Sequence, residues 1–113
     1  MNRFHFPLAD ALAGLPPESQ TGRRYVEPFT HGTMRLGFYA PRGHDPQTPH
    51  DQDELYVVQS GSGVFCLGDS ETRFGPGDTL FVPAGQTHRF ESFTDDFGAW
   101  VIFWGPAGGE SVE

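Results

Sequence analysis

Short apolar stretches separated by turn residues run through most of this chain. Between residues 33 and 40 the apolar positions alternate with other residues, so that Met34, Leu36, Phe38 and Ala40 share one face of an extended strand. Further strands are expected over residues 54–60, 64–67, 71–74, 79–82, 86–93 and 98–104. Clusters of Gly, Pro and Asp separate these strands, and Gly61-Ser62-Gly63 is typical of a hairpin turn. The pattern predicts an all-β protein, built as an antiparallel sandwich or barrel.

One short helical segment is expected before the strands. It covers residues 6–15, with Pro7 at its first position and with Leu8, Leu12 and Leu15 spaced for one helical face. A Pro-Pro pair follows directly and ends the helix.

The length of 113 residues corresponds to one domain, spanning residues 1–113. We expect a core over about residues 25–104, an N-terminal extension over 1–24, and a flexible tail over 105–113 that lacks apolar anchors. The chain holds 15 Gly and 10 Pro, which excludes a helix bundle because both residues break helices. Aromatic residues make up 14%, which excludes a plainly disordered chain.

The charge of the chain limits the classes of partner that it can bind. The formal net charge is −8, which excludes a basic surface for nucleic acid or for an anionic membrane. All seven basic residues are Arg, and without Lys there is no Schiff-base or P-loop chemistry. No apolar run approaches the roughly 20 residues that cross a bilayer, and the N-terminus shows no signal-peptide pattern. Cys66 has no cysteine to pair with, so we expect a cytoplasmic protein.

Metal-ligand residues lie at the starts of two predicted strands. His50 precedes Glu54 by four positions, and His88 follows a Pro-x-Gly turn. Imidazole and carboxylate groups that leave the ends of rigid strands can converge inside a barrel. Two His and one carboxylate with open positions are the composition of non-haem Fe²⁺ sites, and they also suit Zn, Mn or Ni. On spacing alone, a solvated His–Glu pair is the alternative to a metal site.

The first of these clusters resembles the first motif of the cupin superfamily. That motif reads His-x-His, three or four residues, Glu, six residues, Gly. Its second half is matched here by His50, Glu54 and Gly61. Thr48 stands where the motif has its first His.

The second cluster resembles the second cupin motif, which reads Gly, five residues, Pro-x-Gly, two residues, His, three residues, Asn. Four residues match it in order and spacing: Gly77, Pro83, Gly85 and His88. Ser92 stands at the final Asn position. Because four fixed residues at fixed spacing rarely arise by chance, this motif is the more specific of the two.

The resemblance covers about residues 33–104 and implies a small single-domain bacterial cupin, with an antiparallel double-stranded β-helix or jelly-roll barrel. It implies one divalent metal ion, Fe, Zn, Mn or Ni, held by His50, Glu54 and His88. Thr48 either supplies a weak hydroxyl ligand or holds a metal-bound water, and a metal-free site is the alternative. His44 is either a substitute ligand or a solvated loop residue.

Strand parity predicts which side chains lie beside the ligands. If Glu54 points inward, Tyr56 does so too, and an inward His88 places Phe90 and Ser92 on the same side. We therefore expect four residues to line a pocket or to support the ligands: Thr48, Tyr56, Phe90 and Ser92. Tyr56 is the nearest candidate proton donor; the alternative is that Tyr56 and Phe90 only fill the core.

The other face of the same strands is also apolar, with Leu55, Val57, Phe65 and Leu67. Apolar residues on both faces of a sheet indicate that both faces are covered. In a chain of this length the second cover is expected to be another copy, which makes the protein a homodimer.

Three functions remain open at this level. The first is a metal-dependent enzyme of dioxygenase or isomerase type that acts on a small organic molecule in the barrel pocket. The second is a non-catalytic cupin that binds a small ligand or a metal, and the third is a metal-free structural cupin. Cupins carry many unrelated functions, so the expected fold does not choose among them.

Overall fold

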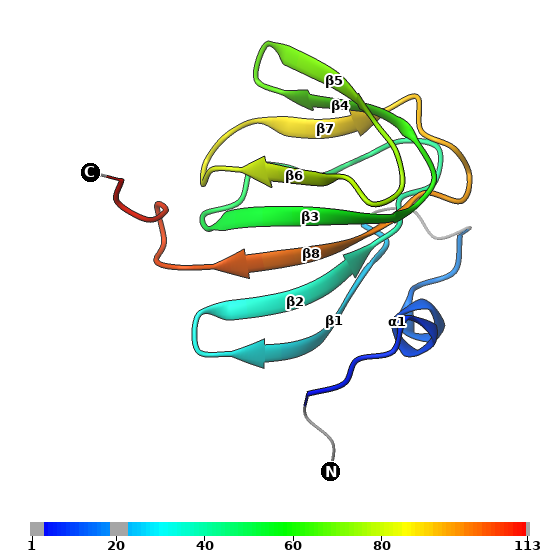
Figure 1. The fold of residues 1–113 in the computed structure, drawn as a ribbon, viewed down its shortest axis with the longest axis horizontal. Helices are drawn as coiled ribbons and strands as arrows, with labels where there is room; N and C mark the ends of the chain where they lie inside the picture. The colour runs from blue at the N-terminus through cyan, green and yellow to red at the C-terminus, as the bar shows by residue number, and fades with distance from the viewer. Residues whose placement is uncertain (1–3, 19–22, 113) are drawn as a thin grey trace.

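The computed structural model of the protein describes residues 4–18 and 23–112. Within these ranges the chain forms one short helix and eight strands (Figure 1). The elements are α1 (Leu8–Gly14), β1 (Tyr25–His31), β2 (Met34–Tyr39), β3 (Asp53–Ser60), β4 (Gly63–Leu67), β5 (Ser70–Phe74), β6 (Thr79–Val82), β7 (His88–Glu91) and β8 (Gly98–Trp104).

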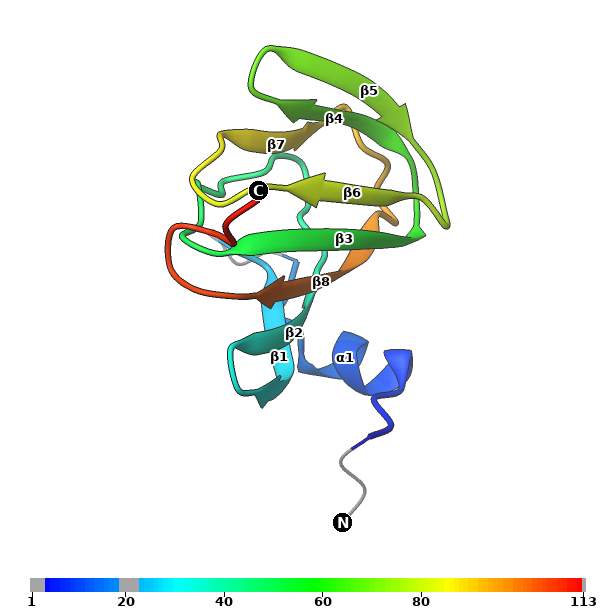
Figure 2. The ribbon, with the colours of Figure 1, turned by 60° about the vertical axis from the view of Figure 1, so that its left-hand side comes forward.

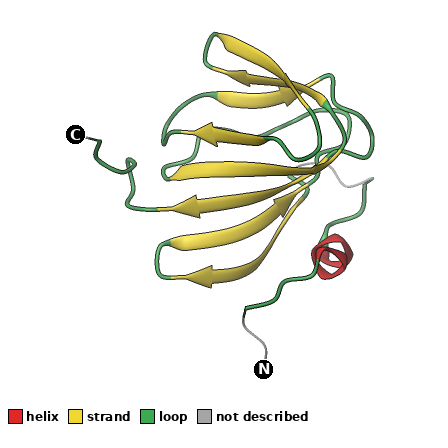
Figure 3. Cartoon of the chain, viewed as in Figure 1, coloured by secondary structure: helices red, strands yellow, loops and turns green. Residues whose placement is uncertain are grey.

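The strands form two sheets in which every pairing is antiparallel. The larger sheet has the order β1-β2-β8-β3-β6, and the smaller has the order β5-β4-β7. Figure 3 shows how fully strands dominate the chain, and Figure 2 shows α1 on the outer side of β1 and β2. From β3 onward the chain alternates between the sheets, with only β4 and β5 paired as sequence neighbours. This winding is that of a jelly-roll barrel, which confirms the predicted fold class.

The connection between β3 and β4 differs from the predicted hairpin. Strand β3 pairs with β8 and β6, whereas β4 pairs with β5 and β7, so Gly61-Ser62-Gly63 is a crossing from one sheet to the other. Gly61 has a φ of +83°, and a Cβ atom there would lie 2.5 Å from the Cα of Phe97. A glycine is therefore needed for its backbone conformation and for the close approach of another segment. A hairpin and a sheet crossing use the same turn residues, so local sequence does not separate them.

Strand β1 lies outside the predicted strands. It contains Pro28, and its register with β2 shifts between Val26 and Phe29. Because β1 is an edge strand, a missing backbone N–H costs little on its unpaired side. Because proline is unfavourable in most strands, the sequence pattern does not predict this one.

Helix α1 is shorter than predicted, and its buried face is different. Pro7 is the N-cap residue rather than the first helical residue, with φ −62° and ψ 141°. The helix ends before Leu15, which is extended because a proline follows it. Ala11 is buried against the outer face of the larger sheet, whereas Leu12 is exposed. The predicted leucine stripe is therefore wrong at Leu12.

Aromatic rings fill the interior of the barrel. The buried cluster consists of Tyr39, Tyr56, Val58, Phe65, Phe74, Val82, Phe90, Phe97, Ala99, Val101 and Phe103. Tyr56 and Phe90 point inward, as strand parity predicts, and their ring centroids lie 4.9 Å apart. Phe65 and Leu67 are expected on the opposite face, but Phe65 lies in this core and Leu67 packs against it. The two sheets face each other, so parity on β3 does not carry over to β4.

The C-terminal segment has polar rather than apolar anchors. The backbone N–H of Gly108 donates to the carbonyl oxygen of Asp51 at 2.7 Å, and that of Glu110 donates to Asp53 Oδ2 at 2.9 Å. The N–H groups of Glu110 and Ala84 lower the pKa of Asp53. The predicted flexibility of this tail stays a prediction. In the described ranges no helix is long and apolar enough to cross a membrane.

Candidate metal centre

The three predicted ligands converge from both sheets. His50 lies on the loop that leads into β3, Glu54 is the second residue of β3, and His88 is the first residue of β7. One ligand atom of each lies within 4.8 Å of those of the other two. The Nε2 atom of His88 lies 3.1 Å from Glu54 Oε1, and the Nε2 atom of His50 lies 3.8 Å from the same oxygen. Both imidazoles thus face one carboxylate.

The Glu54 carboxylate is buried without a hydrogen-bond donor. Its side chain has no exposed surface, and neither of its oxygens has a hydrogen-bond partner. The facing His88 Nε2 is also buried and has no such partner. Burying a charge or a lone pair without a partner costs free energy. Such groups are therefore expected where a bound cation or a proton interacts with them.

A hydrogen bond to the backbone determines which nitrogen of the neutral His88 ring has a free lone pair. The Nδ1 atom lies 3.0 Å from the carbonyl oxygen of Gln86, which only accepts hydrogen bonds, so Nδ1 carries the proton. In the neutral ring Nε2 is then an acceptor aimed at another acceptor. A metal ion between them binds both groups, and the hydrogen bond at Nδ1 fixes the ring orientation, as is common for metal-bound His. The residues present therefore fit a divalent metal.

The pKa values of the two imidazoles shift in opposite directions. Burial is the largest influence on His88 and lowers its pKa, but Glu54 and the Gln86 carbonyl together outweigh burial, so the pKa is raised. Burial lowers the pKa of His50, and the attraction of Glu54 offsets this only in part. A neutral His50 keeps a lone pair available for a metal.

A wall of aromatic rings surrounds the ligands. The ring of His50 lies 5.1 Å from that of Phe103, and the ring of His88 lies 6.2 Å from Tyr56 and 6.4 Å from Phe65. Burial and the nearby Glu54 raise the pKa of the Tyr56 phenol well above its usual value. This packing buries Glu54 and His88 and strengthens the electrostatic interaction between them.

Gln47 is a neighbour of the cluster that sequence reasoning missed. Its Oε1 atom accepts a hydrogen bond from the Tyr56 hydroxyl at 3.0 Å and lies 3.3 Å from His50 Nε2. Its Nε2 atom donates to Asp45 Oδ2 at 2.8 Å. The Asp-Pro dipeptide two residues before Gln47 was the available signal, because Asp side chains often accept the backbone N–H two residues on. The backbone N–H of Gln47 lies 3.2 Å from Asp45 Oδ1 in this way.

Three predicted site residues lie elsewhere. Thr48 and His44 are exposed on the loop before β3. Ser92 is exposed as well, with a φ of +51°, because β7 ends at Glu91 and strand parity no longer applies beyond it. Ser92 and His44 border a surface hollow and are not part of the metal-ligand group.

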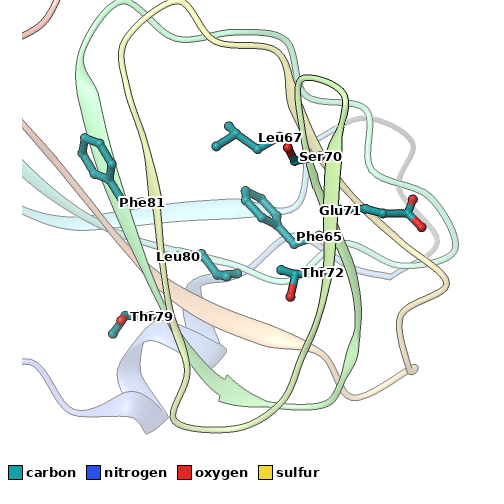
Figure 4. Close-up of a pocket in the computed structure, with 8 residues that line it drawn as sticks. All are labelled: Phe65, Leu67, Ser70, Glu71, Thr72, Thr79, Leu80 and Phe81. Carbon is teal, nitrogen blue, oxygen red and sulfur yellow. The ribbon is translucent and has the colours of Figure 1, made fainter.

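A hollow of about 260 Å³ lies where β6 faces β4 and β5 (Figure 4). Its walls are partly apolar and partly polar, and consist of Phe65, Leu67, Ser70, Glu71, Thr72, Thr79, Leu80 and Phe81. Phe65 borders this hollow and also packs against the rings of Tyr56 and His88. One aromatic side chain therefore connects the hollow with the ligand cluster.

A family model for the cupin domain matches residues 36–104. The chain belongs to the cupin family. The resemblance of its two motifs to cupin motifs is thereby confirmed.

Individual relatives share the domain to different extents. The uncharacterized protein SCO3923 of Streptomyces coelicolor is 34% identical over 84 residues, which are 73% of this chain and 80% of that protein. Dimethylsulfoniopropionate lyase DddQ of Ruegeria pomeroyi is 33% identical over 69 residues, 59% of this cupin but only 34% of the lyase. The structure of plu4264 from Photorhabdus luminescens superposes with a TM-score of 0.71 at 17% identity, covering 93% and 89% of the two chains. That last likeness concerns the fold alone.

The buried carboxylate predicts an unusual stability effect. In metal-free protein, Glu54→Gln should raise the free energy of unfolding by about 1–3 kcal/mol, because an amide is neutral and can donate to His88 Nε2. Urea unfolding in the presence of a chelator measures this change. Glu27→Gln, at an exposed acid outside the cluster, should not raise stability. A loss of stability in Glu54→Gln would show that the carboxylate is already satisfied without a metal.

Proposed function

We propose that this cupin binds one divalent metal ion through His50, Glu54 and His88, and that a small organic molecule reacts beside it. The observation that carries the proposal is the Glu54 carboxylate, which is buried with no hydrogen-bond donor and faces two imidazole nitrogens. Two His and one carboxylate leave further positions open to a substrate. When bound, such a metal acts as a Lewis acid on an oxygen atom of the substrate.

Tyr56 is the proposed proton donor. Its raised pKa keeps the phenol protonated at neutral pH, and its hydroxyl lies at the edge of the cluster, in contact with Gln47. A protonated phenol in a buried site can donate to a developing oxyanion or enolate. This favours an isomerase-type or elimination-type reaction, and the name of the Ruegeria relative, a lyase, points the same way. The match covers only about a third of that lyase, so its substrate is not transferred.

The hollow beside Phe65 suggests the size and character of the substrate. Its volume of about 260 Å³ suits a small molecule, and its lining combines apolar side chains with hydroxyl and carboxyl groups. A movement of the Phe65 ring would connect this hollow with Tyr56 and His88. The substrate is therefore proposed to be small and partly apolar, with at least one oxygen function.

A non-catalytic metal-binding role is the second candidate. The burial of Glu54 and His88 favours it, because both are almost without exposed surface. The hollow at Phe65, the one beside α1 and the one bordered by His44 and Ser92 are not lined by any of the three candidate ligands. Turnover by the metal-loaded protein separates the two candidates.

We also propose that the protein is a homodimer with a cytoplasmic location. Beyond the end covered by α1, the outer face of the larger sheet carries partly exposed apolar side chains: Leu36, Leu55, Phe81, Ile102 and Trp104. The ring centroids of Phe81 and Trp104 lie 6.1 Å apart. A second copy covering this face would remove the apolar strip from water.

Metal content tests the first part of the proposal. Protein purified without a tag or added metal should hold about one divalent metal per chain, and His88→Ala should lose it. Removing the metal should lower the midpoint of thermal unfolding, because a ligand that binds only the native state stabilises it. His31→Ala, at an exposed His on β1, should keep the metal. Metal-free wild-type protein, or His88→Ala with full metal content, would contradict the proposal.

Turnover tests the role of Tyr56. Metal-loaded protein should accelerate the ketonisation of small aromatic enols, followed by the loss of enol absorbance, and Tyr56→Phe should lower kcat about 100-fold. The metal content of Tyr56→Phe should remain that of the wild type. Tyr25→Phe, which removes a hydroxyl bound to Glu27, serves as the matched control. Oxygen consumption with the same compounds would instead assign dioxygenase chemistry, and no turnover would favour the binding role.

Light scattering at micromolar concentration tests the homodimer. The wild type should have the mass of two chains, and Phe81→Glu should be monomeric because it places a charge on the apolar face. Leu12→Glu on α1 is matched in exposure, 49% against 50% for Phe81, and should remain dimeric. A monomeric wild type would contradict the proposal.

A further inference from the structure

The first cupin motif of this chain lacks one imidazole, and Thr48 does not replace it. Thr48 stands at the position of the missing His and is exposed. The preceding side chain, Gln47, turns toward the cluster instead. Its Oε1 atom lies 3.3 Å from Nε2 of His50, the nitrogen that faces Glu54.

We infer that the side-chain oxygen of Gln47 is a fourth protein ligand of the metal, in place of the motif His. This inference rests on the proposed metal site. Two ligand atoms bound to one ion at about 2.1 Å lie about 3.0–3.4 Å apart when they occupy adjacent positions. The distance between Gln47 Oε1 and His50 Nε2 falls in this range, as does the 3.1 Å between Glu54 Oε1 and His88 Nε2.

Asp45 holds the amide so that its oxygen faces the cluster. A carboxylate only accepts hydrogen bonds, so the group of Gln47 that lies 2.8 Å from Asp45 Oδ2 is the NH₂ group. The other end of the amide, its oxygen, then necessarily faces His50 and Tyr56. The hydroxyl of Tyr56 also donates to this oxygen, at 3.0 Å.

Asp45 is itself held by donors from two other elements. It accepts a hydrogen bond from the Tyr39 hydroxyl on β2, and its Oδ2 accepts one from the backbone N–H of Phe90 on β7 at 2.8 Å. Phe90 follows His88 by two residues on the same strand. The chain Phe90–Asp45–Gln47 therefore fixes the proposed fourth ligand relative to His88.

The chemistry of the donor set changes with this replacement. An amide oxygen is neutral, like the imidazole it replaces, so Glu54 still provides the single negative charge. The set becomes two nitrogens and two oxygens, which is harder than three nitrogens and one oxygen. Asp45 acts as a positioning residue, because it reaches the metal only through Gln47.

Binding of Co²⁺ to the metal-free full-length protein tests the inference. Chelator competition gives the Kd, and the visible absorption of bound Co²⁺ reports its ligands. Gln47→Ala should weaken binding about 10- to 100-fold and change the absorption spectrum, whereas Thr48→Ala, next to it in the chain, should change neither. Asp45→Asn should weaken binding in the same direction because it no longer orients the amide. Gln47→Met keeps the length of the side chain without its oxygen, and it replaces Gln47→Ala if that variant does not fold.

The outcomes separate this inference from the proposed function. If the wild type binds Co²⁺ and His88→Ala does not, the metal site stands whatever Gln47 does. Unchanged Kd and spectrum in the folded Gln47 variant, or an effect of Thr48→Ala alone, would overturn the fourth ligand. A wild type that binds no Co²⁺ would overturn both.

Discussion

The buried carboxylate of Glu54 is the constraint on which the site depends. It lies on β3, between β8 and β6 in the larger sheet, so its inward side chain cannot turn to water. Burial of an unpaired charge costs on the order of several kcal/mol. Neither oxygen has a hydrogen-bond donor assigned among the described residues, and the imidazoles of His50 and His88 face it. A proton on His88, whose pKa Glu54 raises, or a divalent cation held by all three side chains would turn these contacts into attractive ones.

The winding of the barrel creates this arrangement. Glu54 belongs to the larger sheet and His88 to the smaller, so the ligands meet only because the sheets pack face to face. Aromatic rings fill the space between the sheets and leave the ligands little freedom to move. The carbonyl of Gln86 then orients the His88 ring from the strand end. The candidate ligands are thus positioned both by aromatic packing and by a hydrogen bond to the backbone.

Much of the fold could be predicted from the sequence, but some strands, turns and side-chain positions could not. The strands over residues 79–82 and 98–104 are found at the predicted bounds, because local alternation and flanking turns define them. The edge strand β1 was missed, since its proline is tolerated only where no partner strand needs the N–H. The turn residues at Gly61 predict a hairpin, but the same residues serve the crossing between the sheets that the chain makes there. Strand parity predicts an inward Ser92, but β7 ends at Glu91 and parity does not apply beyond it.

The sequence by itself determined the family, most of the strands and the three candidate metal ligands His50, Glu54 and His88. These features depend on residue types at fixed local spacing, which can be seen without coordinates. The tertiary structure alone decided which strands pair, that Phe65 lies in the core, and that Gln47 rather than Thr48 faces the ligands. The direction of a loop side chain depends on partners distant in the chain, here the tyrosine hydroxyl and the β7 backbone that hold Asp45. Local sequence carries no record of those contacts, because they exist only after the two sheets have come together.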